Sequence, residues 1–209
     1  MPRARRRQRL RNERLQHAQP LASLWALRMV VDLGGARQLG GFQDDEVAAI
    51  GGLDLSTPST HKREGQKELF EACEARLAEL ERAKPAVRDP LARNLDALAR
   101  QLNLTELERG ILVFTTFLKT SRSFDSVADM LGRQEVDSAV QIMAELLEVD
   151  VEDVQRALAR DARLARSGLL SIDHASRGDF ASLFDPLDGL PRLLMDPTLG
   201  EGDILRAFF

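Results

Sequence analysis

Apolar residues recur three and four positions apart along most of this 209-residue chain, which is the spacing of one face of an α-helix. The clearest run is Leu91, Leu95, Leu98 and Leu102. The residue supply agrees with it, because Tyr is absent, aromatic residues reach only 5%, and strands favour aromatic and β-branched side chains. We therefore predict an all-α, mainly helical fold, with a small winged-helix-like β element near 169–173 as its one candidate strand.

Changes in composition divide the chain into three predicted segments. Residues 1–19 are Arg-rich and lack apolar periodicity, which is typical of a basic flexible arm. Residues 20–55 predict a short helical subdomain, in which one helix ends at Gly34-Gly35 and a second covers 44–50. A polar stretch containing Pro58 then marks a boundary, and a helical domain is predicted over 60–209.

The helical domain begins with a charged helix predicted from about Lys62 to Ala83, whose apolar stripe includes Cys73. Pro85 and Pro90 break the pattern before the next helix. A further helix start is predicted at Thr105 to Glu108, because the Thr hydroxyl and the Glu carboxylate can satisfy each other's free backbone donors in a capping box.

Residues 104–175 contain three predicted helices followed by a short apolar segment, an order that resembles a winged-helix unit. Residues 139–147, a tight turn at 148–150 and a helix over 151–165 would form its helix-turn-helix, and 169–173 its strand. A plain helical bundle gives much the same periodicity, so both interpretations stay open.

Two groups of arginines are the candidate contacts with a partner or with nucleic acid. The first group is Arg156, Arg160, Arg163 and Arg166. Their spacing of four and three residues lets them line one face of a helix, although solvated helix surfaces have the same pattern. The second lies in the arm and includes Arg5, Arg6 and Arg7. The first fourteen residues hold seven Arg and one acid, so the rest of the chain carries a formal charge of −10 against −4 for the whole. Only the arm or a local patch is therefore expected to attract phosphates.

Patterns that carry catalytic chemistry are not found in the sequence. No Gly-Lys pair of a phosphate-binding loop occurs, and we expect no bound ATP or other cofactor. No metal site is expected, because His17, His61 and His174 lie far apart, and acids at Asp44 to Glu46 suit a helix start. The single Cys73 is interpreted as a buried core thiol. No apolar run is long enough for a membrane span, and a cytoplasmic protein is expected.

Three stretches together resemble the helical region that precedes the ATPase core in certain bacterial AAA-type (AAA+) ATPases: Asn94 to Ala99 with Leu104 to Leu112, Arg163 to Ile172, and Asp203 to Phe209. The resemblance covers roughly the last 120 residues and rests on degenerate leucine-rich motifs. It implies that a P-loop ATPase domain follows Phe209 in the natural protein, and an oligomer formed through that ATPase stays open. The Walker motifs are absent from this chain, so no ATP-binding residue is carried over.

The sequence therefore leads to two functional hypotheses. The first is a non-catalytic amino-terminal recognition or regulatory module that binds a protein partner or substrate for the fused motor. The second is a winged-helix DNA-binding transcriptional regulator, in which the arginine-bearing helix enters a groove and the arm adds phosphate contacts. An enzyme is not expected, because no convergent set of acid, base and nucleophile can be assembled.

Overall fold

The computed structural model describes residues 20–41, 43–53, 62–172, 177–200, 202–203 and 206. Its described part is mainly helical with two small antiparallel sheets, which confirms the predicted fold class. The helices are α2 (Pro20–Val31), α3 (Asp44–Gly51), α4 (Lys62–Ala83), α5 (Leu91–Leu102), α6 (Glu106–Thr120), α7 (Arg122–Asp129), α8 (Val136–Leu147), α9 (Val151–Ala157), α10 (Arg163–Arg166) and α11 (Leu190–Leu194), with 3₁₀ helices η1 (Gly35–Gln38) and η2 (Phe180–Leu183). The strands are β1 (Arg133–Gln134), β2 (Leu170–Ile172), β3 (Gly178–Asp179) and β4 (Phe184–Pro186).

The chain forms two compact units that differ from the segments expected from the sequence. The first unit comprises the described residues of 1–86 and 122–131, and the second comprises those of 87–121 and 132–209. The expected boundary near 55–60 falls inside the first unit, because α4 packs against α2. A polar linker separates two helices along the chain, but their apolar faces can still share one core.

The core of the first unit is built around α2, which is buried on nearly all sides. Trp25, Leu27 and Met29 are among its buried residues. Helices α3, α4 and α7 pack against it, and α7 also packs on α3. Cys73 on α4 is fully buried, as predicted.

The core of the second unit is built on α6, whose Phe114 is fully buried. Phe114 meets Phe180 of η2 edge to face, with ring centroids 5.8 Å apart. Phe180 in turn contacts Phe184 of β4, with centroids 5.4 Å apart. These rings join the helical layer to the strands, and edge-to-face pairs of this kind add to the free energy gained by burial.

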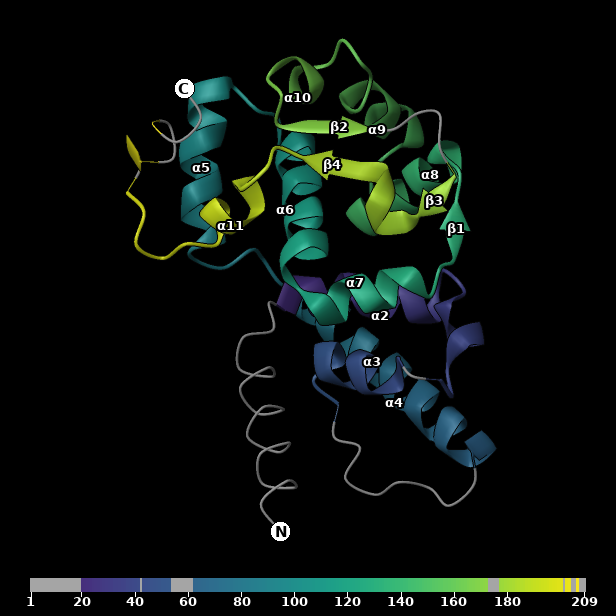
Figure 1. Ribbon diagram of the computed structural model, residues 1–209. Coiled ribbons are helices and arrows are strands. Elements are labelled where there is room, and N and C mark those ends of the chain that lie inside the picture. Colours follow the sequence, from purple (N-terminus) through teal and green to yellow (C-terminus); the bar gives the residue numbers. More distant parts are fainter. Residues whose placement is uncertain are drawn as a thin grey trace. The chain divides into compact units, whose positions relative to one another are not determined.

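The strands of the second unit form two separate antiparallel pairs. The predicted strand near 169–173 is confirmed as β2, which pairs with β4, Ser171 lying opposite Asp185. Strand β1 pairs with β3 instead, so the four strands do not form one sheet. Figure 1 shows β2 and β4 lying side by side near α6.

The single helix predicted over 151–165 is wrong, because the structure has two short helices there. Helix α9 ends at Ala157, and Leu158 adopts φ −101° and ψ 0°, which is outside the helical range. Helix α10 then begins at Arg163 and covers only four residues. The apolar residues Val154 and Leu164 are both buried. The continuous apolar periodicity therefore comes from buried residues on two successive short helices rather than on one long helix.

Helix α5 holds the segment that follows β4. The Asn94 side chain is 1% exposed and donates from Nδ2 to the carbonyls of Leu194, at 3.1 Å, and Asp196, at 2.8 Å. Leu194 is the last residue of α11, where a helix leaves its last acceptors without internal partners, and Asp196 lies just after the helix. Arg93 donates to the Pro197 carbonyl at 3.1 Å. One helix face thus fixes the position of α11.

Candidate functional site

The four candidate arginines of the second unit do not share one helix. Arg156 lies on α9, Arg160 lies in the turn that follows, and Arg163 and Arg166 lie on α10. All four are exposed. The continuous basic stripe that we predicted from their spacing therefore requires a helix that the structure breaks at Leu158.

Arg163 is occupied in holding the fold. Its Nη1 donates to Glu108 Oε2 at 2.9 Å and also to the Asn103 carbonyl. Glu108 lies in the first turn of α6, and its side chain is 8% exposed against 43% for Arg163. Its partner is therefore a largely buried carboxylate, so docking on a phosphate would require breaking this ion pair.

Acidic residues surround the start of α9, the end that a recognition helix would present to base edges. Glu148, Asp150 and Glu152 are exposed there. Asp153 forms an ion pair with Arg156 across one turn, which neutralises one of the candidate cations. Within the described residues, Arg160 and Arg166 have no side-chain partner. Two of the four candidate arginines therefore have no side-chain partner in the described part of the chain, and three exposed carboxylates lie at the start of α9.

Several predicted residues cannot be placed. Arg5, Arg6 and Arg7 of the arm lie outside the described residues, as do the three histidines and the terminal Phe208 and Phe209. Among the described residues, no group of three or more His, Cys, Asp or Glu side chains is arranged to hold a metal ion.

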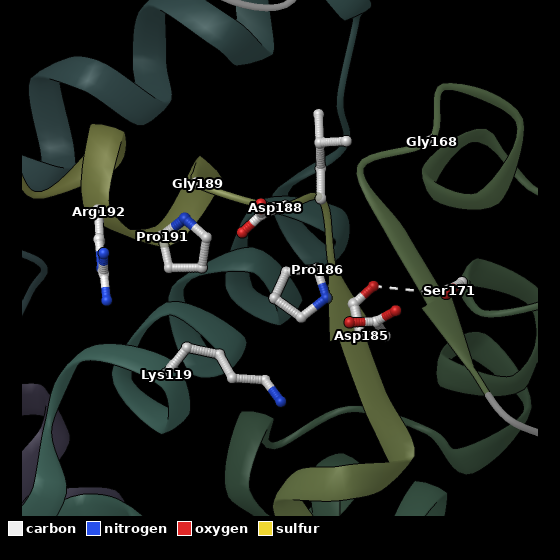
Figure 2. A pocket seen from close by; sticks show the side chains of 10 residues that line it. Lys119, Gly168, Ser171, Asp185, Pro186, Asp188, Gly189, Pro191 and Arg192 are labelled. Atoms are coloured by element: carbon white, nitrogen blue, oxygen red, sulfur yellow. Dashed lines mark hydrogen bonds between the residues drawn. The ribbon is translucent and has the colours of Figure 1, made fainter.

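A cavity of about 610 Å³ lies within the second unit, beside the β2–β4 pair (Figure 2). Its walls come from three places: Lys119 at the end of α6, Gly168 and Ser171 around the start of β2, and residues 185–189, 191 and 192 of β4, α11 and the turn between them. Pro186 and Pro191 are buried and provide apolar surface, while Gly189 adopts φ 78° and turns the chain into α11. The volume is in the range of small-molecule and peptide-side-chain pockets.

Four exposed charged side chains line this cavity, two of each sign: Lys119, Asp185, Asp188 and Arg192. Figure 2 shows them arranged around Pro186 and Pro191, with the Ser171 hydroxyl bonded to the Asp185 carbonyl. Lys119 donates to the Ala181 carbonyl at 3.0 Å. The side chains of Asp185, Asp188 and Arg192 form no hydrogen bond or ion pair with any described residue.

No pattern in the sequence predicted this cavity. Its charged residues come from segments that lie far apart in the chain, since Lys119 is on α6 and Arg192 is on α11. The available signal was the Pro and Gly content of 186–191, which breaks periodicity and marks an irregular segment where binding residues often lie. No pattern in that segment indicates what lies opposite it.

No helix among the described residues is long and apolar enough to cross a membrane. Comparison of the chain with protein-family models, with curated proteins and with solved structures finds no match.

Proposed function

We propose that this chain is the non-catalytic amino-terminal recognition or regulatory region of a bacterial AAA-type ATPase, and that it binds a protein partner or substrate for the fused motor. The proposal starts from the resemblance of the leucine-rich stretches to the region that precedes such an ATPase core. Asn94, which begins the first of those stretches, is buried and bonded to the end of α11. The motif residues thus have a packing role, which is what a folded recognition module requires.

The charge around α9 favours protein recognition over DNA binding. The second unit carries 19 acidic and 13 basic residues, a formal net charge of −6. Its exposed acids Glu148, Asp150 and Glu152 lie at the end of the helix that would approach the bases. Phosphate contacts supply a large share of the affinity for DNA, and acidic side chains at this end of the helix repel phosphates. The exposed acids at the start of α9 are therefore the observation that favours protein recognition over DNA binding.

Two measurements test the link to a motor: the gene sequence beyond the codon for Phe209, and ATP binding by the shorter and longer proteins. We expect the reading frame to continue past Phe209 into a Gly-rich loop followed by Lys and Ser or Thr. The 209-residue chain should not bind a fluorescent ATP analogue, whereas the longer protein should bind and hydrolyse ATP. A stop codon directly after Phe209, or tight ATP binding by the shorter chain, would refute the proposal.

The DNA alternative is tested by fluorescence anisotropy with a labelled 30-base-pair duplex at several salt concentrations. We expect only weak, non-specific binding, with a dissociation constant of about 10⁻⁴ to 10⁻⁶ M at physiological salt. That binding should not change in the double variant Arg160→Ala, Arg166→Ala, which removes the two unpaired cations. Tight binding lost in that variant would support the DNA-binding regulator instead.

A further inference from the structure

The cavity beside the β2–β4 pair combines an apolar floor with unpaired charges of both signs. The floor is Pro186 and Pro191, which are buried. The charged groups around it are Lys119, Asp185, Asp188 and Arg192, and Figure 2 shows them on different sides of the two prolines. A cavity with this lining can bind apolar atoms at its centre and charged groups at its edge.

The balance of charges decides which ligand fits. A polyanion such as a nucleic acid would be attracted to Lys119 and Arg192 but repelled by two carboxylates, Asp185 and Asp188. A polycation would be attracted to Asp185 and Asp188 but repelled by Lys119 and Arg192. A ligand that carries one acidic and one basic group can pair with both, and the side chains of Asp185, Asp188 and Arg192 have no partner of their own among described residues.

The backbone of β4 limits how such a ligand can bind. Leu187 N–H donates to the Leu169 carbonyl at 2.9 Å, and Ser171 lies opposite Asp185. The backbone N–H groups of residues 185 and 187 therefore point toward β2. The backbone nitrogen of Pro186, between them, points away from β2. Pro186 has no N–H, so an incoming strand cannot pair fully along this edge. Recognition must rely on side chains.

From these observations we propose that the cavity is a docking site for an extended segment of a protein partner that carries one acidic and one basic side chain two residues apart. In an extended peptide, residues i and i+2 point to the same face, so both charges can face the cavity. Their aliphatic stems would cover Pro186 and Pro191. The inference rests on the proposed role in protein recognition and names the surface and the chemistry of the partner.

The test uses the ¹⁵N-labelled 209-residue chain and four capped tripeptides followed by NMR. Glu-Ala-Lys and Lys-Ala-Glu are the mixed-charge probes, and Glu-Ala-Glu and Lys-Ala-Lys are the same-charge probes. We expect at least one mixed-charge probe to shift the amides of Gly168, Ser171, Leu187 and Gly189 and to bind about fivefold or more tightly than both same-charge probes, since each exposed ion pair contributes up to about fivefold.

Variants separate this site from general surface charge. Arg192→Glu should weaken the preferred mixed-charge probe by about fivefold or more. The matched control Arg166→Glu makes the same charge change on an exposed arginine that does not line the cavity, and it should leave binding within about twofold. Equal binding of all four peptides, shifts only elsewhere, or no effect of Arg192→Glu would overturn the proposal.

The same variant distinguishes this inference from the proposed function. In the longer ATPase, partner-stimulated ATP hydrolysis should fall when Arg192→Glu is introduced and should persist with Arg166→Glu. Stimulation that survives Arg192→Glu would show that another surface recognises the partner, which overturns the cavity assignment while the proposed function stands. A reading frame without a P-loop would overturn the proposed function, whatever the tripeptides do.

Discussion

Arg163 of α10 and the Thr105 backbone N–H donate to the same oxygen of Glu108, Oε2, at 2.9 and 2.7 Å. The Thr105 hydroxyl accepts the Glu108 N–H at 3.2 Å, which completes the capping box predicted from the sequence. Arg163 also donates to the Asn103 carbonyl. One carboxylate therefore both begins α6 and ties it to α10, 55 residues away.

Arg163→Ala should lower the free energy of unfolding by about 1.5–3 kcal/mol, because it leaves a largely buried carboxylate without its cation. Urea unfolding measures the change as a lower midpoint. The control is Arg166→Ala on the same short helix, which removes an exposed arginine without a side-chain partner. It should change stability by less than about 0.5 kcal/mol. Equal effects of the two variants would contradict a specific role for Arg163.

Glu108→Ala should cost more than Arg163→Ala, since it removes the capping-box bond from the Thr105 N–H as well as the ion pair. We expect a loss of about 2–4 kcal/mol from the two effects together. A double-mutant cycle with Arg163→Ala should give a coupling energy of about 0.5–3 kcal/mol, as for residues in direct contact. Additive losses would show that the two side chains act independently.

Asn94→Asp should destabilise the second unit more than Asn94→Ala. Nδ2 of Asn94 donates to the carbonyls of Leu194 and Asp196, and a carboxylate would place a charged acceptor against them. Asn94→Ala should cost about 1–3 kcal/mol. Hydrogen exchange at α11 should accelerate in both variants, with the larger increase in Asn94→Asp. Unchanged exchange there would mean that Asn94 does not hold this helix.

Cys73 should resist alkylation in the folded protein. Burial, with Asp44 and Glu74 nearby, raises the pKa of its thiol to about 12, so the reactive thiolate is scarce near neutral pH. Iodoacetamide modification, followed by mass spectrometry at pH 8, should track global unfolding in urea. Because this pKa is raised, the thiol's contribution to stability is intact below about pH 9 and is lost as pH rises toward 12. Rapid labelling without urea would contradict this assignment.

Asp32→Asn should stabilise the first unit at neutral pH. Partial burial and the charge of Glu81 raise the pKa of Asp32, while Arg28 opposes them. Asp32 also follows the last residue of α2, where the helix dipole disfavours a negative charge, by about 0.3–1 kcal/mol. A raised pKa means that protonation favours the folded state, so the advantage of Asn over Asp should shrink as pH falls through the pKa of Asp32. Thermal unfolding at pH 7 and at pH 3.5 measures the difference.

Local signals in the sequence were sufficient to predict most of the helices. The predicted helix from Lys62 to Ala83 is confirmed as α4, and the capping box at Thr105 begins α6 as expected. These features depend on residues within one or two turns of each other. The break at Leu158 escaped prediction because apolar periodicity continues through it. Helix α9 packs on α8 and α6 whereas α10 packs on β2, and such tertiary contacts are not visible in a local pattern.

The sequence alone determined that this chain is mainly helical, where most of its helices begin and end, and that Cys73 is a core residue, because spacing and capping act over a few residues. Only the tertiary structure decided that α4 and α7 share a core with α2, that Arg163 pairs with Glu108, and that Lys119 and Arg192 line one cavity. Periodicity shows which face of a helix is apolar. It does not specify which other face will cover it, because that choice depends on packing between segments distant in the chain.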